Sequence, residues 1–301
     1  MDVLRTQRLT KSFGHTTVVD QVSLSVPAGS VFGFIGENGA GKTTTMKMVL
    51  GLLKPDSGEV FVCDEPVRFG MTKTNRHVGY LPDVPEFYPY MRAREYLRLC
   101  GEISGLTSAD IRTRSGELLE LVGLAKVNKR IGGYSRGMKQ RLGVAQALIN
   151  RPQLLICDEP TSALDPVGRK EVLDTLGQIS STTTVIFSTH VLSDVERICD
   201  RIALLHQGKI VLQGTLAELK ARHASTGLLV EFANADDAAR FAALVPPDLV
   251  KERSGTELTL RTTDPAAELS VLKTLADHDV VPTRFEQLEP TIESLFLEAV
   301  R

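Results

Sequence analysis

The residues best suited to chemistry lie in the segment 36–44, GENGAGKTT, which fits the pattern G-x-x-x-x-G-K-[ST]. An apolar, β-prone run, SVFGFI, precedes the segment, and TTTMKMVLGLL, with apolar residues at helical spacing, follows it. Glycines let successive backbone N–H groups point at one anion, and the new helix adds its positive end. Lys42 can reach the β- and γ-phosphates of a nucleotide, and the Thr43 hydroxyl can ligate Mg²⁺.

This order of strand, glycine-rich loop and helix predicts a phosphate-binding loop. The alternative interpretation is a flexible turn, which glycine also favours. The predicted nucleotide-binding residues of the loop are Gly36, Glu37, Asn38, Gly39, Ala40, Gly41, Lys42, Thr43 and Thr44.

Two neighbouring acids end another apolar run, LLICDEP, at residues 154–160. Unpaired carboxylates at the end of a buried strand are costly, so stability alone does not explain them. Beside a phosphate loop, Asp158 suits Mg²⁺ binding. Glu159 points elsewhere and suits a residue that orients or deprotonates water. Two solvated loop acids are the alternative.

Length and composition limit the classes of protein to consider. The 301 residues suffice for about two domains. The net charge of −2 gives no global basic field that would recruit nucleic acid. The N-terminus lacks the apolar core of a signal peptide, and no stretch approaches the roughly 18 apolar residues of a membrane helix. We therefore expect a chain that does not cross a bilayer by itself.

The four cysteines are isolated in the sequence, with no C-x-x-C pair. We expect them to be small buried residues of a protein from a reducing cytoplasm, not disulfides or zinc ligands. They are Cys63, Cys100, Cys157 and Cys199.

The elements that must position these residues follow an alternating pattern. Apolar strands alternate with helices from the first predicted strand, VSLSV at 22–26, to about residue 218, which predicts a buried, mostly parallel sheet. A helical stretch interrupts the alternation at about 92–150. The segment 206–214, HQGKIVLQG, predicts a hairpin with Gln207 and Gly208 in its turn.

The pattern changes near residues 219–227. Beyond this point the predicted order is β-α-β-β-α-β, the ferredoxin-like signature, followed by a last helix. We predict an α/β domain at 1–218, with a helical subdomain at about 92–150, and a small accessory α+β domain at 225–301. The second domain contains no recognisable catalytic constellation.

Four segments occur in the order GENGAGKTT, YSRGMKQRL, LLICDEPTSALDP and STH. Together they closely resemble the motifs of the ATP-binding cassette (ABC) ATPases, the motor subunits of ABC transporters, over residues 1 to about 218. The resemblance implies a P-loop NTPase with a RecA-like core. It makes Asp158 the magnesium-associated acid, Glu159 the catalytic glutamate and His190 the switch histidine that senses the γ-phosphate.

The resemblance also implies nucleotide contacts outside the phosphate loop. Phe13 lies where the family stacks an aromatic ring on adenine, although core filling is the alternative. The segment SALD at 162–165 resembles the D-loop that crosses between subunits. We therefore predict that Asp165 also contacts the nucleotide.

The segment YSRGM at 134–138 lies where the family has Leu-Ser-Gly-Gly-Gln. Ser135 and Gly137 match this pattern, whereas Arg136 and Met138 depart from it. Ser135 can still hydrogen-bond a phosphate at a helix N-terminus, and the Gly137 backbone can approach it closely. We expect Arg136 to face solvent.

Asp83 is a second departure, because many members of the family have Gln in this loop, which links Mg²⁺ and water to the helical subdomain. We expect Asp83 to face the metal, with a solvated loop acid as the alternative. The Pro-rich stretch 85–91 then lies in the region that meets the membrane partner. Exposed Phe87, Tyr88 and Tyr90 would anchor such a contact, unless they pack in the core.

The resemblance implies that the chain hydrolyses ATP with Mg²⁺, by attack of water near Glu159. It implies a separate integral-membrane permease and a second cassette, as a homodimer with ATP between the subunits, at the cytoplasmic face of the membrane. YSRGMKQR and the ending LEPTIESLFLEAV most resemble the cassettes of ABC-2-type exporters. The alternative is a nucleotide-switched module acting on a non-transport partner; we expect no nucleic-acid partner.

Overall fold

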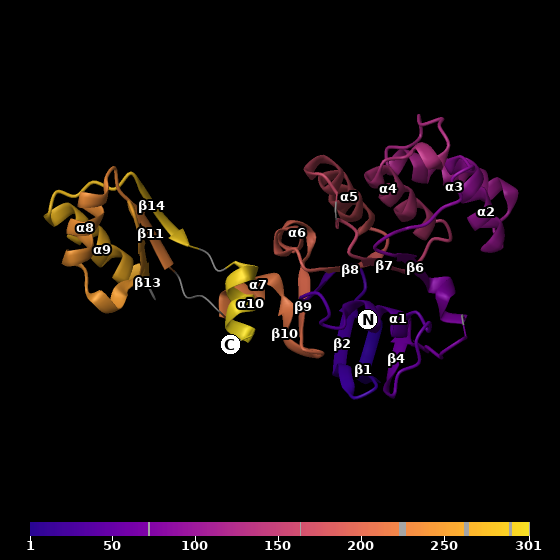
Figure 1. The fold of residues 1–301 in the computed structure, drawn as a ribbon, viewed down its shortest axis with the longest axis horizontal. Helices are drawn as coiled ribbons and strands as arrows, with labels where there is room; N and C mark the ends of the chain where they lie inside the picture. Colours follow the sequence, from indigo (N-terminus) through magenta and orange to yellow (C-terminus); the bar gives the residue numbers. More distant parts are fainter. Residues whose placement is uncertain (72, 163, 223–226, 262–264, 289–290, 301) are drawn as a thin grey trace. The chain divides into compact units, whose positions relative to one another are not determined.

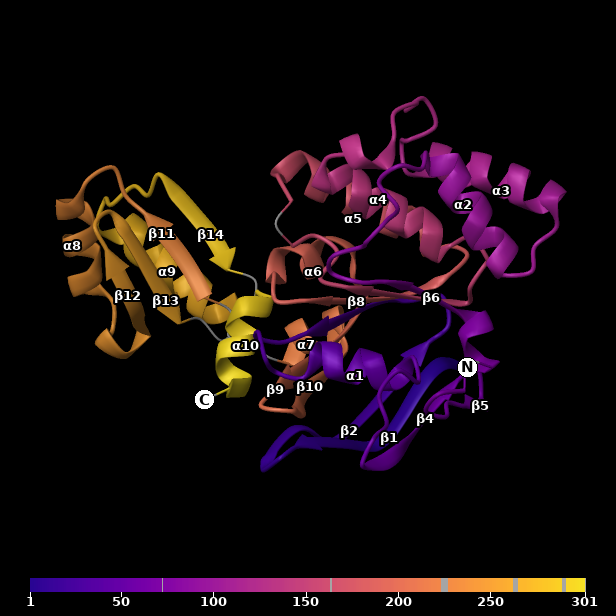
Figure 2. The same cartoon turned by 45° about the vertical axis from the view of Figure 1, so that its right-hand side comes forward.

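A computed structural model describes residues 1–301 except 72, 163, 223–226, 262–264, 289–290 and 301. Contacts within the described chain separate two compact units, Met1–Leu216 and Ala217–Ala299. Figure 1 and Figure 2 show the helices and strands of each unit in two views.

The first unit is built on a six-stranded sheet of order β10-β9-β3-β8-β7-β6. Strands β3, β7 and β8 are buried along their whole length, as continuous apolar runs in a parallel sheet require. The edge strand β10 runs antiparallel to β9, and the other neighbours are parallel. The strands are β3 (Val31–Ile35), β6 (Val78–Leu81), β7 (Leu154–Asp158), β8 (Thr184–Thr189), β9 (Arg201–His206) and β10 (Lys209–Thr215).

The register of this sheet brings the ends of three strands together. Ile35 of β3 pairs with Thr189 of β8, and Asp158 of β7 pairs with Ser188 of β8. The chain segments that follow β3, β7 and β8 therefore leave the sheet at one edge. In open parallel sheets this carboxyl edge is where ligands bind.

The predicted hairpin at 206–214 is confirmed by β9 and β10. Gln207 has φ 46° and Gly208 has φ 78°. Two successive left-handed residues match the type I′ turn that joins two antiparallel strands through a two-residue loop.

A second, antiparallel sheet of order β2-β1-β4-β5 lies across helix α1 from the first. Met46 and Val49 of α1 share one buried core with Leu4 of β1 and Ile186 of β8. Helix α1 is therefore held between two sheets (Figure 2). The elements are α1 (Lys42–Val49), β1 (Asp2–Phe13), β2 (Thr16–Pro27), β4 (Ser57–Val62) and β5 (Glu65–Pro66).

The sequence predicts no strand before residue 22. The strand β1 and the first part of β2 are therefore not predicted. Both strands are bulged: the β1–β2 register shifts between Thr6 and Leu9, and again between Leu9 and Lys11. Arg8 and Gln21 have positive φ values of 45° and 50°. Bulges break the period-two alternation by which a half-buried strand is recognised in a sequence.

Helices α2 (Ala93–Ile103), α3 (Ser108–Leu121) and α4 (Arg136–Ala147) group on the opposite side of the six-stranded sheet from β1 (Figure 1). Side-chain oxygens cap two of them: Thr107 accepts a hydrogen bond from the Asp110 N–H, and Ser135 accepts one from the Met138 N–H. The remaining helical elements of this unit are η1 (Lys73–His77), η2 (Ile131–Gly133), α5 (Pro166–Ile179) and α6 (Leu192–Ile198).

The second unit has one four-stranded sheet of order β12-β13-β11-β14. This is the ferredoxin-like strand order, with Phe232 and Phe241 in the core at 5.4 Å between ring centroids. The predicted fold class is thus confirmed. Helix α7 (Leu216–Arg222) lies where the sequence indicates only a change of pattern. The other elements are β11 (Gly227–Glu231), α8 (Ala235–Leu244), η3 (Pro247–Leu249), β12 (Val250–Ser254), β13 (Glu257–Arg261), α9 (Pro265–Asp277), β14 (Arg284–Leu288) and α10 (Ile292–Val300).

Close packing of α4 on β6 provides a test of the fold. A Cβ atom at Gly79 of β6 would collide with the Ala147 carbonyl oxygen at the end of α4. We predict that Gly79→Ala lowers the free energy of unfolding by about 2–3 kcal/mol, measured by urea denaturation. The control Gly177→Ala, on an open face of α5, should raise it by about 0.5–1 kcal/mol. Equal stability of Gly79→Ala and the parent chain would contradict this packing.

Candidate nucleotide-binding site

The loop after β3 has a backbone that requires glycine at two points. A Cβ atom at Gly36 would lie 2.5 Å from the Leu205 carbonyl oxygen. At Gly41 the backbone is left-handed, with φ 107°, and a Cβ would lie 2.6 Å from the Val18 carbonyl oxygen. The chain then enters α1 at Lys42, so the loop ends at a helix N-terminus as predicted.

The other predicted loop residues occupy two environments. Glu37, Asn38 and Gly39 are exposed, whereas Ala40 is buried. Thr43 and Thr44 lie in the first turn of α1. The exposed part of the loop is thus open to a ligand, and its two ends are anchored.

Lys42 is buried, with only 6% of its side chain exposed, and is surrounded by oxygen atoms. Its ammonium group donates to the carbonyl oxygens of Gly36 at 2.7 Å and Glu37 at 3.1 Å. It also forms an ion pair with Glu159 Oε1 at 3.2 Å. The loop therefore folds around its own lysine, and the lysine charge is balanced by the acid that follows β7.

Asp158, at the end of β7, is held by hydroxyl groups from two other elements. The Thr43 hydroxyl donates to Oδ2 at 2.8 Å, and the Ser188 hydroxyl donates to Oδ1 at 2.5 Å. Burial raises the pKa of the neighbouring Cys157 thiol, and burial with the charge of Asp158 raises the pKa of Tyr80 to about 12. Cys157 and Tyr80 therefore remain neutral beside this site.

Glu159 lies between Lys42 and His190. Its Oε2 atom is 2.9 Å from His190 Nδ1, and its Oε1 atom has the Lys42 ion pair but no hydrogen bond of good geometry. The backbone of Glu159 has a positive φ of 47°, which costs a non-glycine residue free energy. This turn directs Glu159 to the phosphate loop and not along the strand. The direction agrees with the prediction that Glu159 points elsewhere than Asp158.

The donor set fits ATP and Mg²⁺. Mg²⁺ prefers oxygen ligands and is usually held by one or two protein groups together with phosphates and water. Thr43 and Asp158 supply two adjacent oxygen ligands beside the loop. No group of three or more His, Cys, Asp or Glu side chains suited to a metal occurs in the part of the chain that the structure describes.

Asp83 has partners other than this pair of oxygens. Its carboxylate accepts a hydrogen bond from the Ser162 hydroxyl and lies 4.0 Å from Arg136 Nη2. The described contacts of Asp83 include neither Thr43 nor Asp158, so its metal role stays a prediction. Arg136 is half-exposed, as expected, but it faces this acid as well as solvent.

The remaining predicted residues have no hydrogen bond or ion pair with the phosphate loop among the described contacts of the chain. Ser135 is an exposed helix cap on α4, and Gly137 follows it. Asp165 caps α5 by accepting a hydrogen bond from the Gly168 N–H at 3.1 Å. Phe13 is 51% exposed, with Lys11 Nζ 5.6 Å from its ring centroid. Position 163 of the predicted D-loop lies outside the described residues.

A buried network missed by the sequence interpretation connects the segments around Glu159 and His190. Asp194 of α6 accepts hydrogen bonds from the Thr161 hydroxyl at 2.7 Å and from Arg169 Nε at 2.6 Å. Arg169 also donates to the Ser193 hydroxyl at 3.2 Å. An acid in the first turn of a helix is common in sequences, so no local signal reveals that this one is buried.

Comparison with known proteins identifies the family. Residues 19–162 match the model of the family described as ABC transporter, and residues 214–300 match that of the ATP-binding protein DrrA1-3-like C-terminal domain. The chain is 38% identical to the uncharacterized ABC transporter ATP-binding protein YxlF of Bacillus subtilis over 305 aligned residues, which cover 99% of each protein. This chain belongs to the ABC transporter ATP-binding proteins.

Other relatives of this ABC ATPase agree. The bacitracin transport ATP-binding protein BcrA of Bacillus licheniformis is 39% identical over 73% of this chain and 72% of its own length. The solved structure of cbiO1 from Clostridium perfringens, part of the ABC transporter complex cbiONQ, aligns with a TM-score of 0.68 and 26% identity, over 73% of this chain and 91% of that one. The predicted family, fold and ATPase activity are therefore confirmed.

Across the described ranges, no helix is both long enough and apolar enough to span a bilayer. All four cysteines are free; Cys157 and Cys199 are buried as predicted, whereas Cys63 and Cys100 are only partly buried.

The Asp83–Arg136 pair predicts a charge-dependent effect on ATPase activity. Arg136→Glu should lower kcat/KM several-fold because two carboxylates would then face each other, and Arg136→Glu/Asp83→Lys should recover most of the loss. Half-exposed pairs contribute about 0–1 kcal/mol, so the expected coupling in a double-mutant cycle is about two- to five-fold. Lys170→Glu, the same charge change on exposed α5, is the control. Additive effects of the two substitutions would contradict a functional pairing.

Proposed function

We propose that this ABC ATPase is the motor subunit of an exporter, working with a separate integral-membrane permease at the cytoplasmic face of the membrane. One observation carries the proposal: Lys42, Thr43, Asp158, Glu159 and His190 meet at the carboxyl ends of three adjacent strands. The name of BcrA assigns it to bacitracin transport, and a relative that is 33% identical over 98% of this chain, the Nod factor export ATP-binding protein I of Ralstonia nicotianae, is named for export; both support a role in export. Nothing in these matches favours the alternative of a non-transport partner.

The charges of the site support a route for hydrolysis. Incoming β- and γ-phosphates would compete with Glu159 for the ammonium of Lys42, which releases the carboxylate. Glu159 would then accept a proton from the water that attacks the γ-phosphorus in line with the departing ADP. His190, already in contact with Glu159, would orient it and donate toward the γ-phosphate.

The residues proposed to hold Mg²⁺ are Thr43 and Asp158, with Asp83 as a more distant predicted contact. When bound, Mg²⁺ would neutralise charge that develops on the phosphates. Asp158 is already oriented by two hydroxyl groups, so little rearrangement of the protein is needed to present its oxygen atoms. The phosphate loop and Phe13 complete the site in one chain.

A second copy of the cassette would complete the nucleotide site. Ser135, Gly137 and Asp165 have no hydrogen bond to the phosphate loop of their own chain among the described contacts, and Ser135 and Gly137, at the start of α4, are exposed and half-exposed. In a head-to-tail homodimer they would face the ATP held by the other subunit, where a helix N-terminus favours anions. We propose residues 1–218 as the nucleotide-binding domain, with the helical subdomain at 92–150, and 225–301 as an accessory domain.

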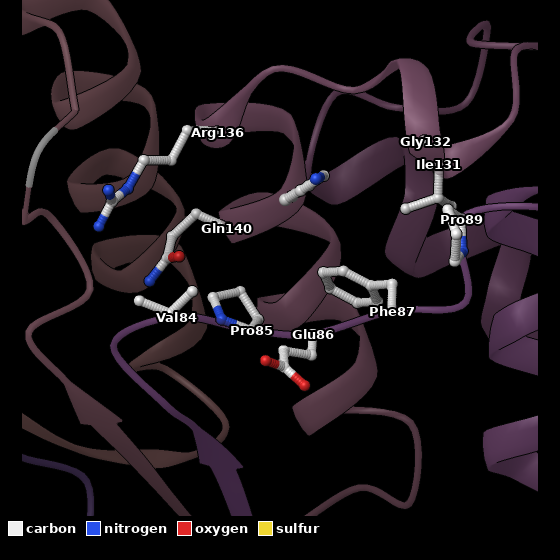
Figure 3. Close-up of a pocket in the computed structure, with 10 residues that line it drawn as sticks. Val84, Pro85, Glu86, Phe87, Pro89, Ile131, Gly132, Arg136 and Gln140 are labelled. Carbon is white, nitrogen blue, oxygen red and sulfur yellow. The ribbon is translucent and has the colours of Figure 1, made fainter.

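The permease is proposed to dock in a groove between the loop after β6 and helix α4. Figure 3 shows Val84, Pro85 and Phe87 along one wall, with Arg136 and Gln140 on the facing helix. The groove has a volume of about 570 Å³, and the Gln140 Nε2 atom is buried without a hydrogen-bond partner among the described residues. An apolar wall with the free amide donor of Gln140 suits the end of a permease helix, which presents a backbone carbonyl oxygen.

Aromatic residues extend this docking surface. Tyr88 and Tyr90 are 51% and 63% exposed, whereas Phe87 packs edge-on against Tyr96 at 5.0 Å between ring centroids. Tyr88 and Tyr90 thus extend the surface beyond the groove, whereas Phe87 lines the groove and also ties the loop to α2.

Two substitutions distinguish binding from hydrolysis. Lys42→Ala should lower ATPase activity by more than about 100-fold, because it removes the charge that faces the phosphates. Glu159→Gln should lower kcat by about 10²–10⁴-fold while ATP still binds, because the amide cannot accept the proton. Both are measured as phosphate release, with nucleotide binding followed separately. Glu120→Gln, on an exposed face of α3, is the control. Wild-type turnover in Glu159→Gln would exclude Glu159 as the base.

The composite site predicts ATP-dependent dimerisation. Glu159→Gln with ATP should shift from monomer to dimer in sedimentation velocity, because unhydrolysed ATP holds the two subunits together. Adding Ser135→Arg should block the shift by filling the contact with a long charged side chain, whereas Ser180→Arg, at the end of α5, should not. A protein that stays monomeric with full ATPase activity would contradict the shared site.

A further inference from the structure

A cavity between α2 and α3 gathers positive charge on the helical part of the first unit. It has a volume of about 320 Å³ and lies outside the nucleotide site and the docking groove. Its lining residues are Arg94, Arg98, Ser108, Ile111, Arg112 and Ser115. Arg94 and Arg98 are one turn apart on α2, and the other four share one face of α3. Three guanidinium groups therefore line one small cavity.

The neighbouring acids have their hydrogen bonds to groups other than Arg94 and Arg112. Arg98 donates from Nε to Glu102 at 2.7 Å. The Glu95 carboxylate accepts from the Arg92 N–H, and the Asp110 carboxylate accepts from the Thr107 hydroxyl. The side chains of Arg94 and Arg112 have no hydrogen bond or ion pair with any described residue. Two guanidinium groups, and the free N–H groups of a third, are thus available to an anion.

A buried hydroxyl group adds an independent sign of a missing ligand. Ser115 is 4% exposed, and its Oγ atom has no hydrogen-bond partner among the described residues. A buried hydroxyl group without a partner costs about 1–3 kcal/mol, so such groups are uncommon in folded proteins. Rotation about a single bond would let Ser115 donate to an oxygen atom in the cavity.

The walls of the cavity are held close together. A Cβ atom at Gly101 of α2 would lie 2.6 Å from Cγ1 of Ile111, so α2 and α3 approach through a position without a side chain. Ile111 is itself buried. The arginines therefore extend from a rigid pair of helices, which lowers the entropy lost when they bind one ligand.

We propose that this cavity binds a phosphate group, either free or in the headgroup of an anionic lipid. Guanidinium groups match phosphate oxygens by paired N–H donors, and the serine hydroxyl supplies one more donor. The site itself is independent of the proposed function, but the lipid source rests on it, because a permease would hold the chain at a membrane. Helix α2 begins next to the docking surface, through the contact of Tyr96 with Phe87.

The experiment uses the full chain with its nucleotide site saturated by Mg²⁺ and a non-hydrolysable ATP analogue, whose γ-phosphate fills the position that free phosphate could otherwise take at the phosphate loop. Inorganic phosphate is titrated calorimetrically, and flotation measures binding to vesicles of phosphatidylcholine with or without phosphatidylglycerol. Arg94→Gln/Arg112→Gln should weaken binding about 10-fold or more. Ser115→Ala should weaken it about three-fold or more without lowering the melting temperature, because the removed hydroxyl has no partner.

The control Arg253→Gln/Arg261→Gln removes the same charge from exposed positions on β12 and β13 and should leave binding unchanged. Loss of vesicle binding alone identifies a lipid headgroup, and loss of phosphate binding as well identifies a site for free phosphate; both support the proposal. No binding of either probe by the parent chain, or equal loss in the control, would overturn it. Retained ATPase activity in Arg94→Gln/Arg112→Gln separates this outcome from failure of the proposed function.

Discussion

The register of β3, β7 and β8 is the constraint on which the site depends. Hydrogen bonding pairs Ile35 with Thr189 and Asp158 with Ser188, so a phosphate loop, two acids and a histidine emerge at one edge of the sheet. A slip of one residue in any pairing would turn the affected side chains to the other face. The buried apolar strands fix the register, and the antiparallel sheet packs on α1 from the other side.

Charge balance within this edge links structure to activity. Lys42 is buried with its charge satisfied by two carbonyl oxygens and Glu159, and Glu159 in turn contacts His190. An isolated buried ammonium group would be costly, so the carboxylate occupies a place that phosphate charge can take over. When phosphate oxygens replace Glu159 beside Lys42, the nucleotide is bound and Glu159, the proposed base, is released. Binding and preparation for hydrolysis are then one electrostatic event.

The sequence predicts those parts of the site that depend on local spacing. The loop at 36–44 and the acids at 158 and 159 carry their chemistry in consecutive residues, and the turn at Gln207 and Gly208 is equally local. The strand β1 escapes prediction because bulges break its alternation. The burial of Asp194 and the contact of Asp83 with Arg136 arise from tertiary packing between distant segments, which no single-sequence pattern reports.

The central claim is that the γ-phosphate of ATP lies between the loop at 36–44 and Glu159. Vanadate trapped with Mg²⁺ and ADP takes the place of the γ-phosphate, and ultraviolet light then cleaves the backbone beside it. Mass spectrometry of the fragments locates the cut. We predict cleavage within residues 36–44, together with a cut near Ser135 if the second cassette completes the site. ATP-dependent trapping with cleavage only at other segments would contradict it.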